Sequence, residues 1–160
     1  MKIVKSLMPY IVIVIVVILI RSFIVTPVKV NGSSMYPTLD GGEIMFLNKL
    51  AKLKRFDIVV LQIDRENEDL IKRIIGLPGE KVKILNNKIY INDEVLEDKY
   101  GFGETNDMDE ITLADDEYLV LGDNRKISLD SRVFGAVKED AIKGTADFVM
   151  YPFKNFGKVE

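Results

Sequence analysis

Hydrophobic positions follow two different patterns along the chain. Up to residue 25 they form one long apolar run, from Leu7 to Val25, which Arg21 and Ser22 interrupt near its end. About 20 apolar residues suffice for a helix to cross a bilayer, and an arginine near the end can reach the headgroups. The run therefore predicts an N-terminal transmembrane helix over residues 1–25 that includes a short cytoplasmic stub.

Two other interpretations of this run are possible. A cleavable secretory segment also has lysines before an apolar stretch, but it requires small residues at a cleavage site, and the first alanine is Ala51. A buried β-strand would be much shorter. The retained anchor is favoured, and Lys2 and Lys5 favour a cytoplasmic N-terminus with the rest of the chain outside.

After residue 25 the apolar stretches are short and mostly alternate with polar residues, a pattern typical of strands. The predicted strands cover residues 44–48, 58–63, 70–75, 82–85, 88–91, 117–121 and 141–150. Asn86 and Asn87 form a hairpin turn between the fourth and fifth of them. The polar segment 97–116 is expected to be a solvated connection. One mainly β domain is therefore expected over residues 26–160.

Composition narrows the possible chemistry. The 160 residues include no cysteine and no histidine, which excludes disulfides, a thiolate nucleophile and every catalytic triad that uses histidine. No metal and no cofactor are expected. The net charge of -3, with dispersed lysines and arginines, gives no reason to expect a nucleic-acid partner. Hydrolytic chemistry would have to use Ser, Thr, Lys, Tyr or carboxylates.

A short block at residues 31–39, NGSSMYPTL, contains a candidate nucleophile. Gly32 permits a sharp turn, Pro37 restricts the chain after it, and Ser34 lies between them. Taken alone, such a segment is more often an ordinary solvated turn, because serine favours turns for conformational reasons.

A second block at residues 69–80, DLIKRIIGLPGE, contains a candidate base. In a strand, Lys72 shares one face with Leu70 and Ile74, so its amine would lie among apolar side chains. Burial disfavours the charged form and lowers the pKa of a lysine, which allows it to accept a hydroxyl proton. The alternative is a lysine that extends from a sheet edge into solvent.

A third block at residues 122–132, GDNRKISLDSR, is rich in hydrogen-bonding side chains. They could form a network that orients a catalytic lysine, although Gly-Asp-Asn also suits a plain turn and an Asp–Arg pair is commonly a weak surface contact.

Together these blocks resemble those of the type I signal peptidases, Ser-Lys enzymes that remove signal peptides from exported proteins. The resemblance rests on SSMYPTL, DIVV, IKRIIGLPG, GDNRKISLDSR and the closing MYPF, which occur in the family's order behind the apolar segment. It implies a mainly β fold, with an N-terminal transmembrane helix followed by a signal-peptidase-type catalytic domain on the outer face of the cell membrane. The implied partners are the signal peptides of preproteins and membrane lipid.

The resemblance also implies individual roles. Ser34 would be the nucleophile, with its backbone N–H as one oxyanion donor, and Lys72 the general base. Ser128 would hold the lysine amine. The residues implied to support it are Arg73, Asp123, Asp130 and Arg132. The residues implied to line pockets for small side chains at the first and third positions before the cut are Val28, Val30, Met45, Val60 and Ile71.

One position departs from part of the family. Some members have a serine two positions before the nucleophile that completes the oxyanion hole, whereas this chain has Gly32, which resembles the single-anchor branch and leaves the second donor unidentified. The alternatives are a peptidase dedicated to pilins or a narrow substrate set, a self-cleaving Ser-Lys regulator, and a non-catalytic anchored binding module. The residues do not distinguish general from dedicated processing, and they do not indicate an oligomeric state.

Overall fold

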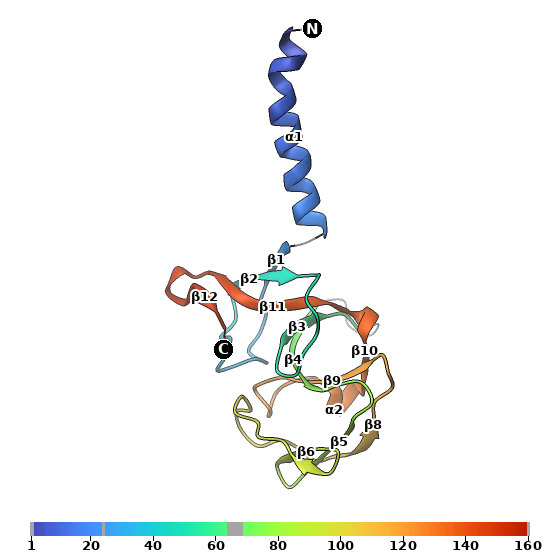
Figure 1. Cartoon of the computed structure of the whole chain (residues 1–160). Helices are drawn as coiled ribbons and strands as arrows, with labels where there is room; N and C mark the ends of the chain where they lie inside the picture. The colour runs from blue at the N-terminus through green and yellow to red at the C-terminus, as the bar shows by residue number, and fades with distance from the viewer. Residues whose placement is uncertain (1, 24, 64–68, 160) are drawn as a thin grey trace.

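The computed structural model describes residues 2–23, 25–63 and 69–159. The first element is the helix α1 (Lys2–Phe23), which extends away from the β domain (Figure 1). Its side chains from Leu7 to Val17 are exposed. Within the described residues, no helix combines the length and the apolar character needed to span a membrane. The helical character of the predicted anchor is confirmed, but its crossing of a bilayer is not.

The remaining described chain forms two antiparallel sheets. The larger sheet has the order β1-β2-β11-β3-β4-β9-β10, with β12 paired to β11, and the smaller has the order β7-β6-β5-β8. The larger sheet contains β1 (Val25–Lys29), β2 (Ile44–Asn48), β3 (Ile58–Leu61), β4 (Leu70–Gly76), β9 (Glu117–Leu121), β10 (Val137–Lys138), β11 (Ile142–Tyr151) and β12 (Gly157–Lys158). The smaller sheet contains β5 (Lys81–Leu85), β6 (Lys88–Ile91), β7 (Glu94–Val95) and β8 (Met108–Thr112).

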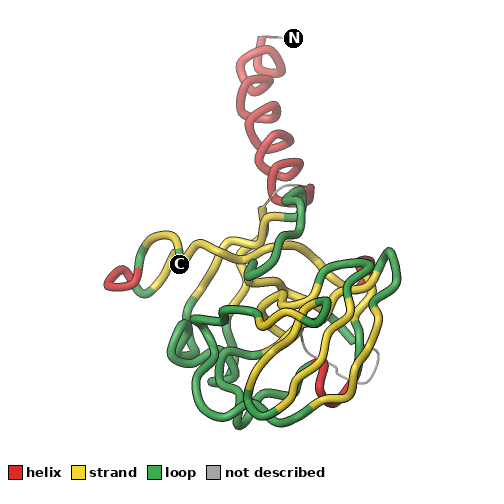
Figure 2. Tube along the Cα trace, turned by 60° about the horizontal axis from the view of Figure 1, so that its bottom comes forward, coloured by secondary structure: helices red, strands yellow, loops and turns green. Residues whose placement is uncertain are grey.

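Helical segments within the domain are short. They are α2 (Ser131–Phe134) and the 3-10 turns η1 (Glu139–Ala141) and η2 (Phe153–Asn155). Figure 2 shows α1 standing apart from the strands and loops of the domain. The prediction of a mainly β domain is confirmed.

The predicted strands agree with the observed ones to within one or two residues, and β5 and β6 pair across the predicted Asn86-Asn87 turn. The prediction for residues 97–116 was wrong in part, because β8 lies within this segment and pairs with β5. Asp109 and Glu110 of β8 are exposed, while Met108 and Ile111 pack against the core. A strand at a sheet edge tolerates such charges, and this conceals its alternation in the sequence.

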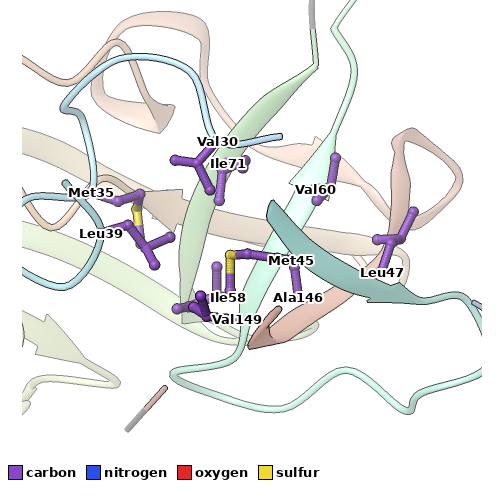
Figure 3. Packing of buried hydrophobic residues seen from close by; sticks show 10 residues of the cluster. All are labelled: Val30, Met35, Leu39, Met45, Leu47, Ile58, Val60, Ile71, Ala146 and Val149. Atoms are coloured by element: carbon purple, nitrogen blue, oxygen red, sulfur yellow. The ribbon is translucent and has the colours of Figure 1, made fainter. Parts of the chain in front are cut away.

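The buried apolar side chains form three clusters. The first cluster consists of Val30, Met35, Leu39, Met45, Leu47, Ile58, Val60, Ile71, Ala146 and Val149, and Figure 3 shows how they gather between the strands. The second lies between β5, β6 and β9, and the third packs β3 and β4 against β9 and β10. The strand β4 contributes to all three, with Ile71, Ile75 and Ile74 respectively. It is therefore covered on both faces.

Candidate active site

Ser34 lies in the Ser34 loop, residues 31–42, which connects β1 to β2. The loop is closed at its base by two backbone hydrogen bonds, from Val30 N–H to the Glu43 carbonyl at 2.8 Å and from Gly42 N–H to the Val30 carbonyl at 2.9 Å. Gly41 has φ +88°, and a Cβ there would lie 2.7 Å from the Gly32 carbonyl oxygen. The two sides of the loop approach so closely only because residue 41 has no side chain.

Ser34 meets Lys72 across the fold. The Lys72 Nζ lies 3.0 Å from Ser34 Oγ and donates to the Ile71 carbonyl at 2.9 Å. Lys72 is 2% exposed, with the third core cluster supplying Leu70 and Ile74 on its own face of β4. The structure thus brings the predicted nucleophile and the predicted base into hydrogen-bond contact.

Burial changes the acidity of the Lys72 ammonium. It lowers the pKa of Lys72 from 10.5 to about 8, because an ammonium removed from water is destabilised relative to the neutral amine. The negative charges of Asp130 and Asp123 act in the opposite direction and keep this pKa from falling further. A substantial fraction of the amine is consequently neutral at a weakly alkaline pH, and a neutral amine can accept a proton.

Arg73, the next residue of β4, forms a buried ion pair with Asp123. The Arg73 Nε and Nη2 donate to the two carboxylate oxygens at 2.8 and 2.7 Å, and Thr38 Oγ1 donates to the same carboxylate at 2.5 Å. The Tyr100 ring covers the guanidinium, with Cζ 3.7 Å from the ring centroid. Asp123 thereby connects β4 to the Ser34 loop.

Asp130 forms a second rigid centre beside the first. Its carboxylate accepts from Gly122 N–H at 3.0 Å and from Arg132 Nε and Nη2, both at 2.8 Å. Asp130 also caps α2 by accepting from the Arg132 N–H. All four predicted supporting residues, Arg73, Asp123, Asp130 and Arg132, therefore form two buried ion pairs.

The predicted hydrogen bond from Ser128 to the lysine amine is not formed. Ser128 Oγ is buried without a hydrogen-bond partner among the described residues, and the two bonds of the Lys72 Nζ go to Ser34 and Ile71. Ser128 nevertheless lies at the site, because its side chain and the Ser34 carbonyl oxygen both face Gly122 closely. A Cβ on Gly122 would lie 2.5 Å from Ser128 Cβ and 2.6 Å from that oxygen.

Asn124 is a contact residue to which the sequence assigned no individual role. Its backbone N–H donates to the Ser34 carbonyl at 3.0 Å, and its Nδ2 donates to the Ser33 carbonyl at 3.2 Å. Both carbonyls that flank the Ser33–Ser34 junction are held by one residue of the third block. Its place directly after Asp123 was the signal, but only the folded chain shows which loop it contacts.

The five residues predicted to line substrate pockets lie together. Val30, Met45, Val60 and Ile71 belong to the first core cluster, and Val28 packs against it (Figure 3). Met35, which directly follows Ser34, belongs to the same cluster. An apolar wall of closely packed side chains thus adjoins the nucleophile.

Metal ligands do not gather anywhere in the described part of the chain: no group of three Asp or Glu carboxylates is placed to hold an ion. The functional groups at this site are those of Ser34, Lys72 and the ion pairs around them.

Comparison with known proteins gives a consistent result. The family model described as "Signal peptidase, peptidase S26" matches residues 2–151. Signal peptidase I S of Bacillus subtilis strain 168 is 40% identical over 162 residues, which cover 91% of this chain and 87% of that protein. Signal peptidase IB of Staphylococcus aureus strain Mu50 is 34% identical over 165 residues, covering 89% and 86%. The crystal structure of a signal peptidase I from Enterococcus faecalis V583 is similar with a TM-score of 0.53 at 34% identity, covering 59% of this chain and 97% of that one.

Proposed function

Because the chain belongs to the signal peptidase family, peptidase S26, and is a serine endopeptidase on that ground, we propose that it cleaves signal peptides with Ser34 and Lys72 as its catalytic pair. The observation that carries the proposal is the 3.0 Å contact between Ser34 Oγ and a buried Lys72 Nζ, in a chain without histidine. A serine hydroxyl needs a neighbouring base to become an effective nucleophile, and Lys72 is the base within reach.

The reaction follows from this geometry. Neutral Lys72 takes the Ser34 proton as Oγ attacks the carbonyl carbon before the cut, and the peptide bond breaks as the proton passes to the leaving amine. The signal peptide is then held as an ester on Ser34. Lys72 next removes a proton from water, which attacks this ester and restores the hydroxyl. The backbone N–H of Ser34 stabilises the negative oxygen that develops in both halves of the reaction.

The supporting residues position the two catalytic groups. Arg73 and Asp123 join the strand that carries Lys72 to the loop that carries Ser34, since Asp123 also accepts from Thr38. Asp130 orients the Gly122 peptide next to Ser34, and Ser128 completes the surroundings of the amine.

Substrate selection is assigned to the apolar wall next to Ser34. Val28, Val30, Met45, Val60 and Ile71 are packed tightly enough that side chains larger than alanine at the first and third positions before the cut would displace them. The substrates proposed are therefore preproteins with small residues at these two positions.

The catalytic domain is proposed to work at the outer surface of the cell membrane, with α1 as a single-pass anchor and its N-terminus in the cytoplasm. The apolar run of the sequence and the exposed apolar side chains from Leu7 to Val17 support this placement, since such a surface is unfavourable in water.

The function is tested with the full chain purified in detergent. Incubation with a preprotein that carries an Ala-x-Ala site should release a mature protein whose new N-terminus directly follows the second alanine. Ser34→Ala serves as the inactive control. Cleavage elsewhere, or equal cleavage by the control, contradicts the proposal.

A further inference from the structure

A cavity of about 440 Å³ opens beside α2, between the loop that leads into this helix and residues 106–107. Ser128 and Arg132 line it, together with the apolar side chains of Ile127, Leu129 and Val133. Its volume is within the range of pockets that bind small ligands or short peptide segments. The reaction scheme above gives this cavity no role.

The cavity is continuous with the catalytic site through Ser128. This serine lines the cavity, and its side chain and the carbonyl oxygen of Ser34 both lie against Gly122. One wall of the cavity is therefore a direct neighbour of the nucleophile.

The position of the first core cluster assigns the two directions of a bound peptide. The Lys72 Nζ, in contact with Ser34 Oγ, also contacts the Ile71 carbonyl, and Ile71 belongs to that cluster. The residues before the cut are proposed to lie there. The carbonyl of Ser34 faces the other way, toward Asn124 and the segment that leads to the cavity. A peptide that crosses Ser34 continues in this direction after the scissile bond.

The lining suits a peptide chain with apolar side chains. Ile127 and Val133 are 61% and 69% exposed, a large apolar area for two residues beside one cavity. Arg132 Nη1 is buried and has no hydrogen-bond partner among the described residues, so the wall contains an unused donor, for which a main-chain carbonyl is a suitable acceptor.

We propose that this cavity binds the segment of the preprotein that follows the scissile bond, with apolar side chains of that segment packed on Ile127 and Val133. This inference rests on the proposed peptidase function and extends it to the part of the substrate that becomes the mature protein. It makes recognition depend on residues on both sides of the cut.

The test compares two synthetic substrates with the same signal peptide. The short one ends two residues after the cut, and the long one continues for five more residues that include leucine and valine. The full chain should have a higher kcat/KM for the long substrate. The double variant Ile127→Ser/Val133→Ser should lose about fivefold to tenfold in kcat/KM on the long substrate, as expected when roughly 1 kcal/mol of apolar contact is removed, and nothing on the short one. The matched control Val95→Ser, at a residue that is 57% exposed on β7, should change neither.

Each other outcome has a definite meaning. An equal loss on both substrates, or no loss on the long one, overturns the inference and leaves the peptidase function in place. Failure of the unaltered chain to cleave either substrate removes the proposed function and the inference with it. Thermal unfolding of each variant checks the fold, and the single variant Ile127→Ser replaces the double one if that protein is destabilised.

Discussion

Ser34 Oγ lies 3.0 Å from Lys72 Nζ although 38 positions separate the two residues in the sequence. The contact joins a loop between β1 and β2 to the middle of β4, so it exists only in the folded domain. Variants at either residue can therefore distinguish chemistry from structure.

Ser34→Ala should abolish cleavage and leave thermal unfolding almost unchanged. The substitution removes one oxygen atom, and without it no ester intermediate forms. The measurement is the rate of preprotein cleavage together with Tm. Ser33→Ala is the matched control and should retain most activity, because the structure uses the Ser33 carbonyl, which the variant keeps. Normal processing by Ser34→Ala would remove this residue from the mechanism.

Lys72→Met should be inactive and folded. Methionine fills the space of the lysine stem without an amine, whereas Lys72→Arg has a permanently charged group and should also be inactive. Cleavage assays and circular dichroism on both variants check this. If Lys72→Met cleaves, or if it does not fold, then the lysine is structural and another base must be found.

Activity should rise with pH through the lowered pKa of Lys72. Only the neutral amine accepts a proton, so the acid limb of the kcat/KM profile should have its midpoint near pH 8, the pKa of the free enzyme. Steady-state rates between pH 6 and pH 10 measure it. A flat profile over this range would show that no group with this pKa takes part.

Stability should depend on the same proton with the sign expected for a lowered lysine pKa. As pH falls from 10.5 to about 8, the unfolded chain binds a proton at Lys72 before the folded chain does, so the folded state loses stability and stays penalised below pH 8. The penalty at pH 7 is at most about 3 kcal/mol. Lys72→Met removes it, so its free energy of unfolding should exceed that of the unaltered chain at pH 7 and converge with it above pH 10.5. Chemical denaturation at both pH values decides the matter.

Gly122→Ala should impair the site through crowding. An added Cβ would lie 2.6 Å from the Ser34 carbonyl oxygen and 2.5 Å from Ser128 Cβ, closer than real atoms approach, so one of the two segments must move. We expect a loss of about 1 to 3 kcal/mol in stability and a larger proportional loss in kcat. Gly79→Ala tests the effect of glycine loss alone, since a Cβ there would meet nothing within 4 Å. Normal kcat in Gly122→Ala would show that the Ser34 loop adapts freely.

Substrate preference should follow the packing of the first core cluster. Preproteins with leucine or phenylalanine at the first position before the cut should be cleaved about tenfold to a hundredfold more slowly than those with alanine, because overpacking commonly costs about 1 to 3 kcal/mol. Competition between matched peptides measures the ratio. Equal rates would mean that Ile71 and its neighbours do not line the pocket.

The sequence predicted the central strands because they combine period-two alternation with clear turns. Ile44–Asn48 and Glu117–Leu121 agree with the prediction residue for residue. It could not predict that β11 inserts between β2 and β3, since this pairing joins segments that are far apart in the chain. Strand β1 was missed because Pro27 and the apolar run before it conceal its pattern.

The candidate site was predictable in its parts but not in its contacts. Lys72 was expected to be buried between apolar neighbours, and it is. Arg73 lies on the opposite face of the same strand and is also 2% exposed, which alternation alone does not indicate, since polar residues on a strand usually face solvent. The contacts of Asn124 and the position of Ser128 depend on how the third block folds over Gly122, and no periodic pattern predicts that.

The carboxylate of Asp123 is fully buried and accepts hydrogen bonds from Arg73 on β4 and from Thr38 on the Ser34 loop. The separation of nucleophile and base is thus measured off from one shared point, as two arms of a compass are from its hinge. A perturbation of the large sheet that moves β4 also moves the anchor of Thr38, so both groups shift in the same direction. The alignment of Ser34 with Lys72 is in this way insulated from small distortions of the rest of the domain, including those that a nearby lipid surface would impose.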